Sequence, residues 1–155
     1  MLPDGRGWDR VTMASMELSE VRVRVRYAET DQMGVVYHAN YLVWMEMGRV
    51  ELCRARGVRY RDMEEKDGVL LAVAEATCRF HFPAHYDDEV IVLTSVKRSN
   101  TRLLEFLYEI REAESRRMLA TGSTKHVFCG RDLKPCRLPA KYHAAFGVIS
   151  RTNLS

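Results

Sequence analysis

The sequence predicts an α+β domain in which an antiparallel sheet of five to six strands wraps around one long buried helix. Three observations support this fold class. A strand pattern near the N-terminus precedes a long, almost continuously apolar helical segment, and four further strand candidates follow at the spacing of an antiparallel meander. A length of 155 residues suits one domain.

The first strand lies where Val21, Val23 and Val25 alternate with three arginines. Side chains alternate between the two faces of a strand, so the valines predict a buried face and the arginines a solvated one. A net charge of +3 is too small to indicate a nucleic-acid-binding protein. The arginines are therefore interpreted as the exposed side of the strand.

Residues 28–36 form a predicted loop containing Gly34, and a helical pattern begins at Tyr37 or His38. The helix is apolar over most of its circumference and is expected to stop at Gly57, a C-cap residue. A helix of this kind needs cover beyond a single sheet face. The sheet must curve around it, or a twofold partner must continue the sheet and protect its edges.

Four strands are expected at residues 69–82, 89–97, 103–112 and 118–129, with Pro83 ending the first of them. Gly122 is expected to mark a bulge in the last strand. Residues 60–68 form a short polar stretch that is expected to hold one helical turn, and residues 140–146 predict a short terminal helix.

The predicted boundaries are a disordered extension at 1–17, a single domain at 18–147 and a C-terminal tail at 148–155. The longest apolar run is shorter than the ~18–20 residues that span a bilayer, and no signal-peptide core is recognised. The spacing of the four cysteines fits no zinc site, and Pro83 separates His81 from His85, so no metal site is expected. Reduced thiols and the missing signal favour a cytoplasmic protein.

The segment from Thr30 to Tyr41 reads TDQMGVVYHANY. An aspartate, two variable residues, a glycine, two apolar residues, Tyr-His, a small residue and Asn-Tyr together resemble the site motif of the 4-hydroxybenzoyl-CoA thioesterase family, in particular its bacterial short-chain acyl-CoA branch. The resemblance covers residues 21–139 and implies the hot-dog fold. One departure is the turn Asp87-Asp88, where the family usually has a glycine followed by an acid.

The resemblance implies hydrolysis of an acyl-CoA thioester to a free acid and CoA. Asp31 is the carboxylate of the motif, and it could act as nucleophile or as general base. The start of the helix near His38 would stabilise the oxyanion through backbone N–H groups. The His38 side chain is either a catalytic group or a wall of the pocket, and without its motif Asp31 would be interpreted as a loop-capping residue.

Substrate contacts are expected from both the motif and more distant cations. Within the motif the candidates are Gly34, Val36, Tyr37 and Asn40. The candidates for binding the CoA phosphates are Arg98, Arg102 and Lys125. Coenzyme A enters only as part of the substrate, and no other cofactor is expected. The expected assembly is a homodimer or a dimer of dimers with sites at subunit interfaces.

Two other functions fit the same fold. One is a non-catalytic module that binds acyl thioesters, although such a module would not need Asp31. The other is a hot-dog hydratase, which resembles this sequence less because that branch places its Asp and His differently. The sequence is compatible with short, long or aromatic acyl groups, and with an acyl carrier protein in place of CoA.

Overall fold

The computed structural model describes residues 18–148. The predicted extension at 1–17 and nearly all of the predicted tail at 148–155 lie outside this range. Along the chain the elements are β1 (Ser19–Arg24), η1 (Tyr27–Glu29), α2 (Ala39–Ala55), α3 (Tyr60–Asp67), β2 (Leu70–Phe80), β3 (Glu89–Ser99), β4 (Leu103–Glu112), β5 (Met118–Cys129), η2 (Ala140–Tyr142) and α4 (His143–Phe146). The fold is α+β, as predicted.

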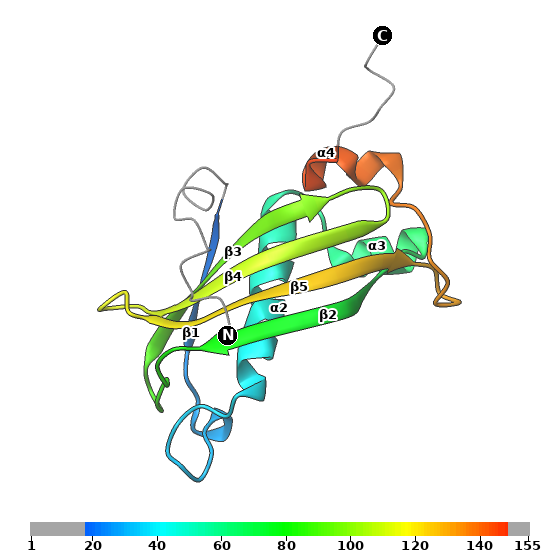
Figure 1. Ribbon diagram of the computed structural model, residues 1–155. Coiled ribbons are helices and arrows are strands. Elements are labelled where there is room, and N and C mark those ends of the chain that lie inside the picture. Colours follow the sequence, from blue (N-terminus) through cyan, green and yellow to red (C-terminus); the bar gives the residue numbers. More distant parts are fainter. Residues whose placement is uncertain (1–17, 149–155) are drawn as a thin grey trace, which may run out of the picture.

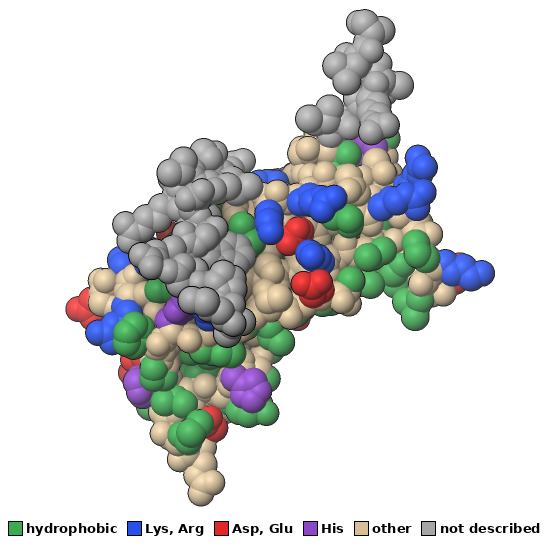
Figure 2. Space-filling view, viewed as in Figure 1, with side chains coloured by type: hydrophobic (Ala, Val, Ile, Leu, Met, Phe, Trp, Pro, Cys, Tyr) green, Lys and Arg blue, Asp and Glu red, His purple; other side chains and the backbone are tan. Residues whose placement is uncertain are grey.

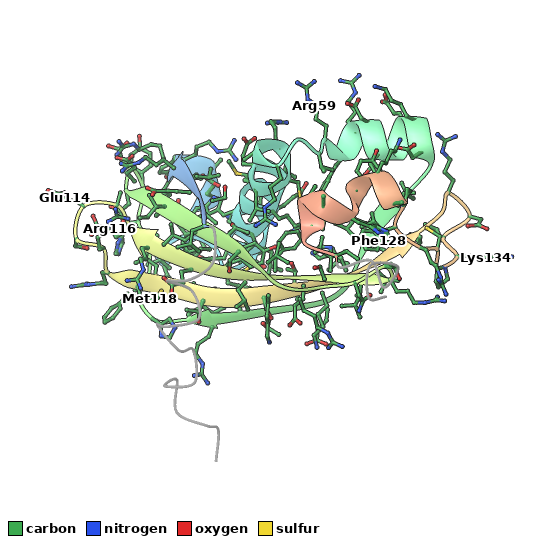
Figure 3. The ribbon with its side chains drawn as sticks, turned by 90° about the horizontal axis from the view of Figure 1, so that it is seen from above. Arg59, Glu114, Arg116, Met118, Phe128 and Lys134 are labelled. Atoms are coloured by element: carbon green, nitrogen blue, oxygen red, sulfur yellow. The ribbon has the colours of Figure 1, made fainter. Side chains whose placement is uncertain are left out.

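The five strands form one antiparallel sheet in the order β1-β3-β4-β5-β2. Helix α2 crosses one face of this sheet, and α3 and α4 lie on the same face at one end (Figures 1 and 3). The β4–β5 turn, which carries Glu114 and Arg116, lies at one end of the sheet, and the loop that carries Lys134 lies at the other (Figure 3).

Helix α2 packs on the sheet through one face, which includes the fully buried Trp44 and Met45. Leu42, Val43 and Met47, on its other side, remain 40–49% exposed in the single chain. The prediction of a helix buried around most of its circumference is therefore met on one side only. This uncovered apolar side is the part of the helix for which the sequence predicts additional packing, by a curved sheet or by a twofold partner.

Gly122 does not form the predicted bulge, because it lies in regular register opposite both Cys78 and Tyr108. Its role is to make room for the helix. A Cβ atom at this position would lie 2.3 Å from Met45 Cε and 2.5 Å from the Thr77 carbonyl oxygen. Register shifts do occur near this strand, between Val73 and Glu75 and between Ile110 and Arg111.

The polar segment after α2 forms a longer helix than the sequence indicated. Helix α3 has eight residues and ends at Gly68, whose φ of +64° is the left-handed conformation that stops a helix. Met63 anchors α3 in the core. A single buried methionine is too weak a periodic signal to predict a helix of this length.

All four cysteines are free. Within the described range, no helix is both long and apolar enough to cross a membrane. No cluster of three or more metal-ligating side chains occurs among the same residues.

Candidate active site

A cavity of about 260 Å³ lies at the N-terminal end of α2, between the loop that precedes this helix and the end of β2. Most of its wall is apolar. The lining residues are Asp31, Met33, Val35, Val36, His38, Tyr41, Phe80, His81, Phe82 and Pro83. The lower end of the molecule in Figure 2, where Figure 1 places this loop and the end of β2, shows hydrophobic side chains gathered with histidines.

The loop that carries Asp31 is a closed turn held by backbone hydrogen bonds. The Asp31 N–H donates to the Val35 carbonyl at 2.8 Å, and the Gly34 N–H donates to the Asp31 carbonyl at 3.0 Å. Gly34 has a φ of +79°, which a residue with a Cβ rarely adopts. A bridge between Thr30 and Val36 closes the base of the turn, so Asp31 sits on a loop of fixed shape.

One carboxylate oxygen of Asp31 has a structural role. Its Oδ1 accepts a hydrogen bond from the Met33 N–H at 2.9 Å, which is the arrangement of a loop-capping aspartate. Within the described chain, Oδ2 makes no protein hydrogen bond. The carboxylate is therefore oriented through one oxygen and open through the other.

Helix α2 begins immediately after His38. The first helical N–H donors with partners are those of Asn40 and Tyr41, which bond to the carbonyls of Tyr37 and His38. In the region covered by the structure, the N–H groups of His38 and Ala39 donate to no protein acceptor. His38 lines the cavity, so the positive end of the helix dipole lies beside the cavity.

Aromatic rings from α2 and β2 form the apolar wall. The Tyr41 ring meets the Phe80 ring edge-on at 5.1 Å between centroids, and the His38 ring lies at 6.4 Å from the same phenylalanine. Burial raises the pKa of Tyr41, whose hydroxyl oxygen accepts the Ala84 N–H at 3.3 Å. This bond ties the cavity wall to the segment that follows Pro83.

The residues predicted within the motif divide into two groups. Asp31, Val36 and His38 line the cavity. Gly34 shapes the turn. The Tyr37 ring lies 4.4 Å from the His38 ring between centroids, tilted by 54°, and Asn40 donates through Nδ2 to the Glu29 carbonyl at 2.8 Å. None of these last three is among the lining residues of the single chain.

The three predicted phosphate contacts lie away from this cavity. Lys125 is in the middle of β5 and pairs with Glu75 at 3.5 Å. Arg102 is in the β3–β4 turn, where its N–H donates to Asn100 Oδ1. Arg98 lines a separate cavity of about 240 Å³ with Arg56, the C-cap residue of α2. That end of a 17-residue helix is roughly 25 Å from its start.

Four lining residues outside the motif segment 30–41 were not assigned to the site from the sequence: Phe80, His81, Phe82 and Pro83. The strand pattern placed them at the end of a long strand, but nothing local shows that this strand end lies beside the Asp31 loop. His81 Nε2 lies 3.2 Å from Thr121 Oγ1, and the Arg117 guanidinium lies 4.7 Å from the centre of the Phe82 ring. A carboxylate, two histidines and an apolar wall thus share one cavity.

Comparisons with known proteins identify relatives of this chain among thioesterases. YneP of Bacillus subtilis (strain 168), whose name assigns it provisionally to the acyl-CoA thioesterases, is 49% identical over 85 residues, which are 55% of this chain and 61% of YneP. The acyl-CoA thioesterase YbgC of Haemophilus influenzae is 33% identical over 127 residues, covering 80% of this chain and 90% of that protein. The crystal structure of a DHNA-CoA thioesterase from Staphylococcus aureus matches with a TM-score of 0.80 and 34% identity, covering 84% of this chain and 89% of that one.

The family model of the thioesterase-like superfamily matches residues 25–146, which include the whole cavity and all of β2 to β5. The predicted resemblance and the predicted hot-dog fold are thereby confirmed. The chain belongs to the thioesterase-like superfamily.

Proposed function

We propose that this protein is an acyl-CoA thioesterase that hydrolyses the thioester to a free acid and CoA. The observation that carries the proposal is that the Asp31 carboxylate and His38, whose backbone N–H has no protein acceptor among the described residues, line one apolar cavity. Thioester hydrolysis needs a base or nucleophile and a donor set for the oxyanion, and this cavity offers both.

Asp31 would act through the oxygen that the loop leaves open. The bond from Met33 to Oδ1 fixes the plane of the carboxylate. Oδ2 would then either take a proton from the attacking water, or attack the carbonyl carbon itself and form a mixed anhydride, whose acyl carbon water attacks in a second step that restores the Asp31 carboxylate. Both routes end with the acyl group on an oxygen from water and with the electron pair of the C–S bond on the CoA sulfur.

The N–H groups of His38 and Ala39 would receive the carbonyl oxygen as its negative charge develops. Losing one such donor typically costs about 2.7–4 kcal/mol of barrier height. These groups belong to the backbone and need no reorganisation as the charge forms. His38 and His81 are the side chains in the cavity that could protonate the departing thiolate, which leaves readily without such help.

The substrate is larger than the cavity of a single chain. Sites for drug-sized ligands are about 300–1,000 Å³, and CoA exceeds such ligands, whereas this cavity is about 260 Å³. We propose that a second copy completes the site by pairing along the free edge of β2. Arg98, Arg102 and Lys125 remain candidate contacts for CoA phosphates in that assembly, and an acyl carrier protein remains a candidate carrier of the acyl group in place of CoA. The chemistry calls for no metal or prosthetic group.

The direct test measures release of free CoA thiol from a panel of short aliphatic, long aliphatic and aromatic acyl-CoAs. Asp31→Asn should lower kcat by roughly 10²–10⁴-fold, the usual contribution of a general base, while CoA binding stays close to that of the wild type. Asp87→Asn is a matched control, because Asp87 is an exposed turn residue with a φ of +69°, a conformation that asparagine also tolerates.

Two results would contradict the proposal. A wild-type protein that hydrolyses no member of the panel would not be a thioesterase of this class. Full activity of Asp31→Asn would leave Asp31 with the loop-capping role alone. A wild-type protein that binds acyl-CoA without cleaving it would instead be the non-catalytic module that binds acyl thioesters.

A further inference from the structure

Glu29 is a buried carboxylate that the proposed reaction does not use. It lies two residues before Asp31, and only 4% of its surface is exposed. An isolated charge at this depth would be unfavourable, so its hydrogen-bond partners have to account for its presence.

The two carboxylate oxygens of Glu29 bind two different elements. Oε1 accepts the Arg26 backbone N–H at 2.9 Å and the Arg26 Nε–H at 3.3 Å. Oε2 accepts the indole N–H of Trp44 at 2.9 Å. Trp44 is fully buried on α2, so the side chain of Glu29 connects the start of the loop to the body of the helix.

The backbone of Glu29 connects to the other end of the same loop. Its carbonyl oxygen accepts the Tyr37 N–H at 2.8 Å and the Asn40 Nδ2–H at 2.8 Å. One residue therefore holds both sides of the segment 30–37 and attaches that segment to α2. Asp31 and the oxyanion donors at His38 and Ala39 are at the two ends of this frame.

The carboxylate is charged at neutral pH in this setting. Burial raises the pKa of Glu29, but the hydrogen bonds from the Arg26 backbone and the Trp44 indole lower it by more, so the pKa lies below the ordinary value. Charge-assisted hydrogen bonds of this kind are shorter and stronger than neutral ones.

We infer that Glu29 is a positioning residue for the hydrolysis: its carboxylate, bonded to Trp44, sets the separation between Asp31 and the N-terminus of α2. The inference rests on the proposed function for its catalytic consequence. A thioester carbonyl must meet both groups at once, and displacement of one by about 1 Å can cost about 100-fold in rate. Glu29 itself touches neither substrate nor reacting atoms.

The test uses Glu29→Gln and Trp44→Phe. Glutamine keeps one acceptor oxygen but presents an amide NH₂ to one of the N–H donors, and phenylalanine keeps the buried ring while removing the indole N–H. We expect each variant to lower kcat at least tenfold with KM within threefold of wild type. The effects of the two changes should be less than additive in the double variant, because both act through the contacts of the Glu29 side chain with Trp44 and Arg26.

A second measurement does not depend on activity. Hydrogen exchange of the N–H groups of Asp31, Gly34, Val36 and Tyr37 should become at least tenfold faster in Glu29→Gln. Tyr108→Phe is the control, because it removes a buried hydroxyl bonded to Thr124 Oγ1 at 2.7 Å but leaves the loop and the cavity untouched. It should alter neither kcat nor the exchange of these four groups.

The outcomes separate the two proposals. Unchanged exchange in Glu29→Gln, or a loss of kcat no larger than that of Tyr108→Phe, would overturn the role of Glu29. Faster exchange with unchanged kcat would show that Glu29 holds the loop without affecting catalysis. This result would also overturn its role as a positioning residue. If the wild type cleaves no acyl-CoA, the proposed function fails, and the exchange measurement still decides whether Glu29 holds the loop.

Discussion

At the scale of single residues, His126 is the clearest case of an ionisable group kept neutral by the fold. Its side chain is 1% exposed on β5, and its Nε2 lies 2.7 Å from Thr124 Oγ1. Burial, together with the nearby Arg49 charge, lowers the pKa of His126 to about 4. The Nδ1 atom has no partner among the described residues, so a protonated ring would leave one buried N–H without an acceptor.

This burial predicts a loss of stability in mild acid. The unfolded chain protonates His126 near its ordinary pKa of about 6.5, whereas the folded chain does so near 4. Between these values the unfolded state binds more protons, so stability falls as pH is lowered from about 6.5 towards 4, by up to about 3 kcal/mol from this residue. Urea unfolding at pH 7 and at pH 4.5 measures how much free energy of unfolding each protein loses in acid. The loss should be smaller for His126→Gln than for the wild type. Equal losses in the two proteins would show that His126 is not the residue responsible.

The residues of the site differ in whether the sequence alone could identify them as members of it. Asp31 and His38 stand in a compact motif, so the motif alone indicated that they belong together, and both line the cavity. Glu29 is adjacent to that motif, but its importance depends on Trp44, 15 residues away, and on burial that no local pattern shows. His81 and its phenylalanine neighbours join the cavity because the end of β2 lies against the start of α2, where the Phe80 and Tyr41 rings meet, and this is a tertiary contact.

At the scale of elements, the contact between α2 and β5 depends on a strand position without a side chain. Met45 occupies the space above Gly122, and the Thr77 carbonyl approaches from β2. Central strand positions seldom favour glycine, because it adds no packing and costs conformational entropy. Here the small residue allows the helix to lie close to the sheet.

Replacing Gly122 with alanine should therefore destabilise the protein by about 1–3 kcal/mol through overpacking. Combining it with Met45→Ala should recover the part of the penalty that comes from contact with Met45. Lys125→Ala on the same strand is the control, because its exposed pair with Glu75 is worth only about 0–1 kcal/mol. Denaturant unfolding of the four proteins measures these differences, and a Gly122→Ala loss no larger than that of the control would contradict the packing role.

The strands were predictable because runs rich in apolar and β-branched residues are separated by short turn-like links, and β4 and β5 have the predicted bounds. The role of Gly122 was not predictable, because a strand glycine signals a bulge or a close contact equally well. Helix α3 was underestimated because its polar sequence buries little more than Met63. Local periodicity thus reveals elements, whereas close contacts between elements depend on which faces meet.

At the scale of the whole molecule, three exposed features of the single chain point to a second copy. Strand β2 is an edge strand of 11 residues whose outer side has no partner in the described structure. Apolar side chains are exposed along it, with Val73 at 55% and Phe80 at 49%. The uncovered side of α2 adds Leu42, Val43 and Met47. A twofold partner pairing along β2 would cover the strand edge and bring a second chain to the cavity.

Light scattering at micromolar concentration should therefore give a dimer or a dimer of dimers. Val73→Glu places a charge on the β2 edge, where it should oppose pairing without affecting the core, since Val73 is already exposed in the single chain. We expect this variant to shift towards monomer and to lose at least tenfold in specific activity at low protein concentration, with recovery as the concentration rises. Leu133→Glu, at an exposed loop position, should leave both properties unchanged. A wild-type monomer with full thioesterase activity would show that one chain holds the complete site, and pairing along β2 would then have no part in catalysis.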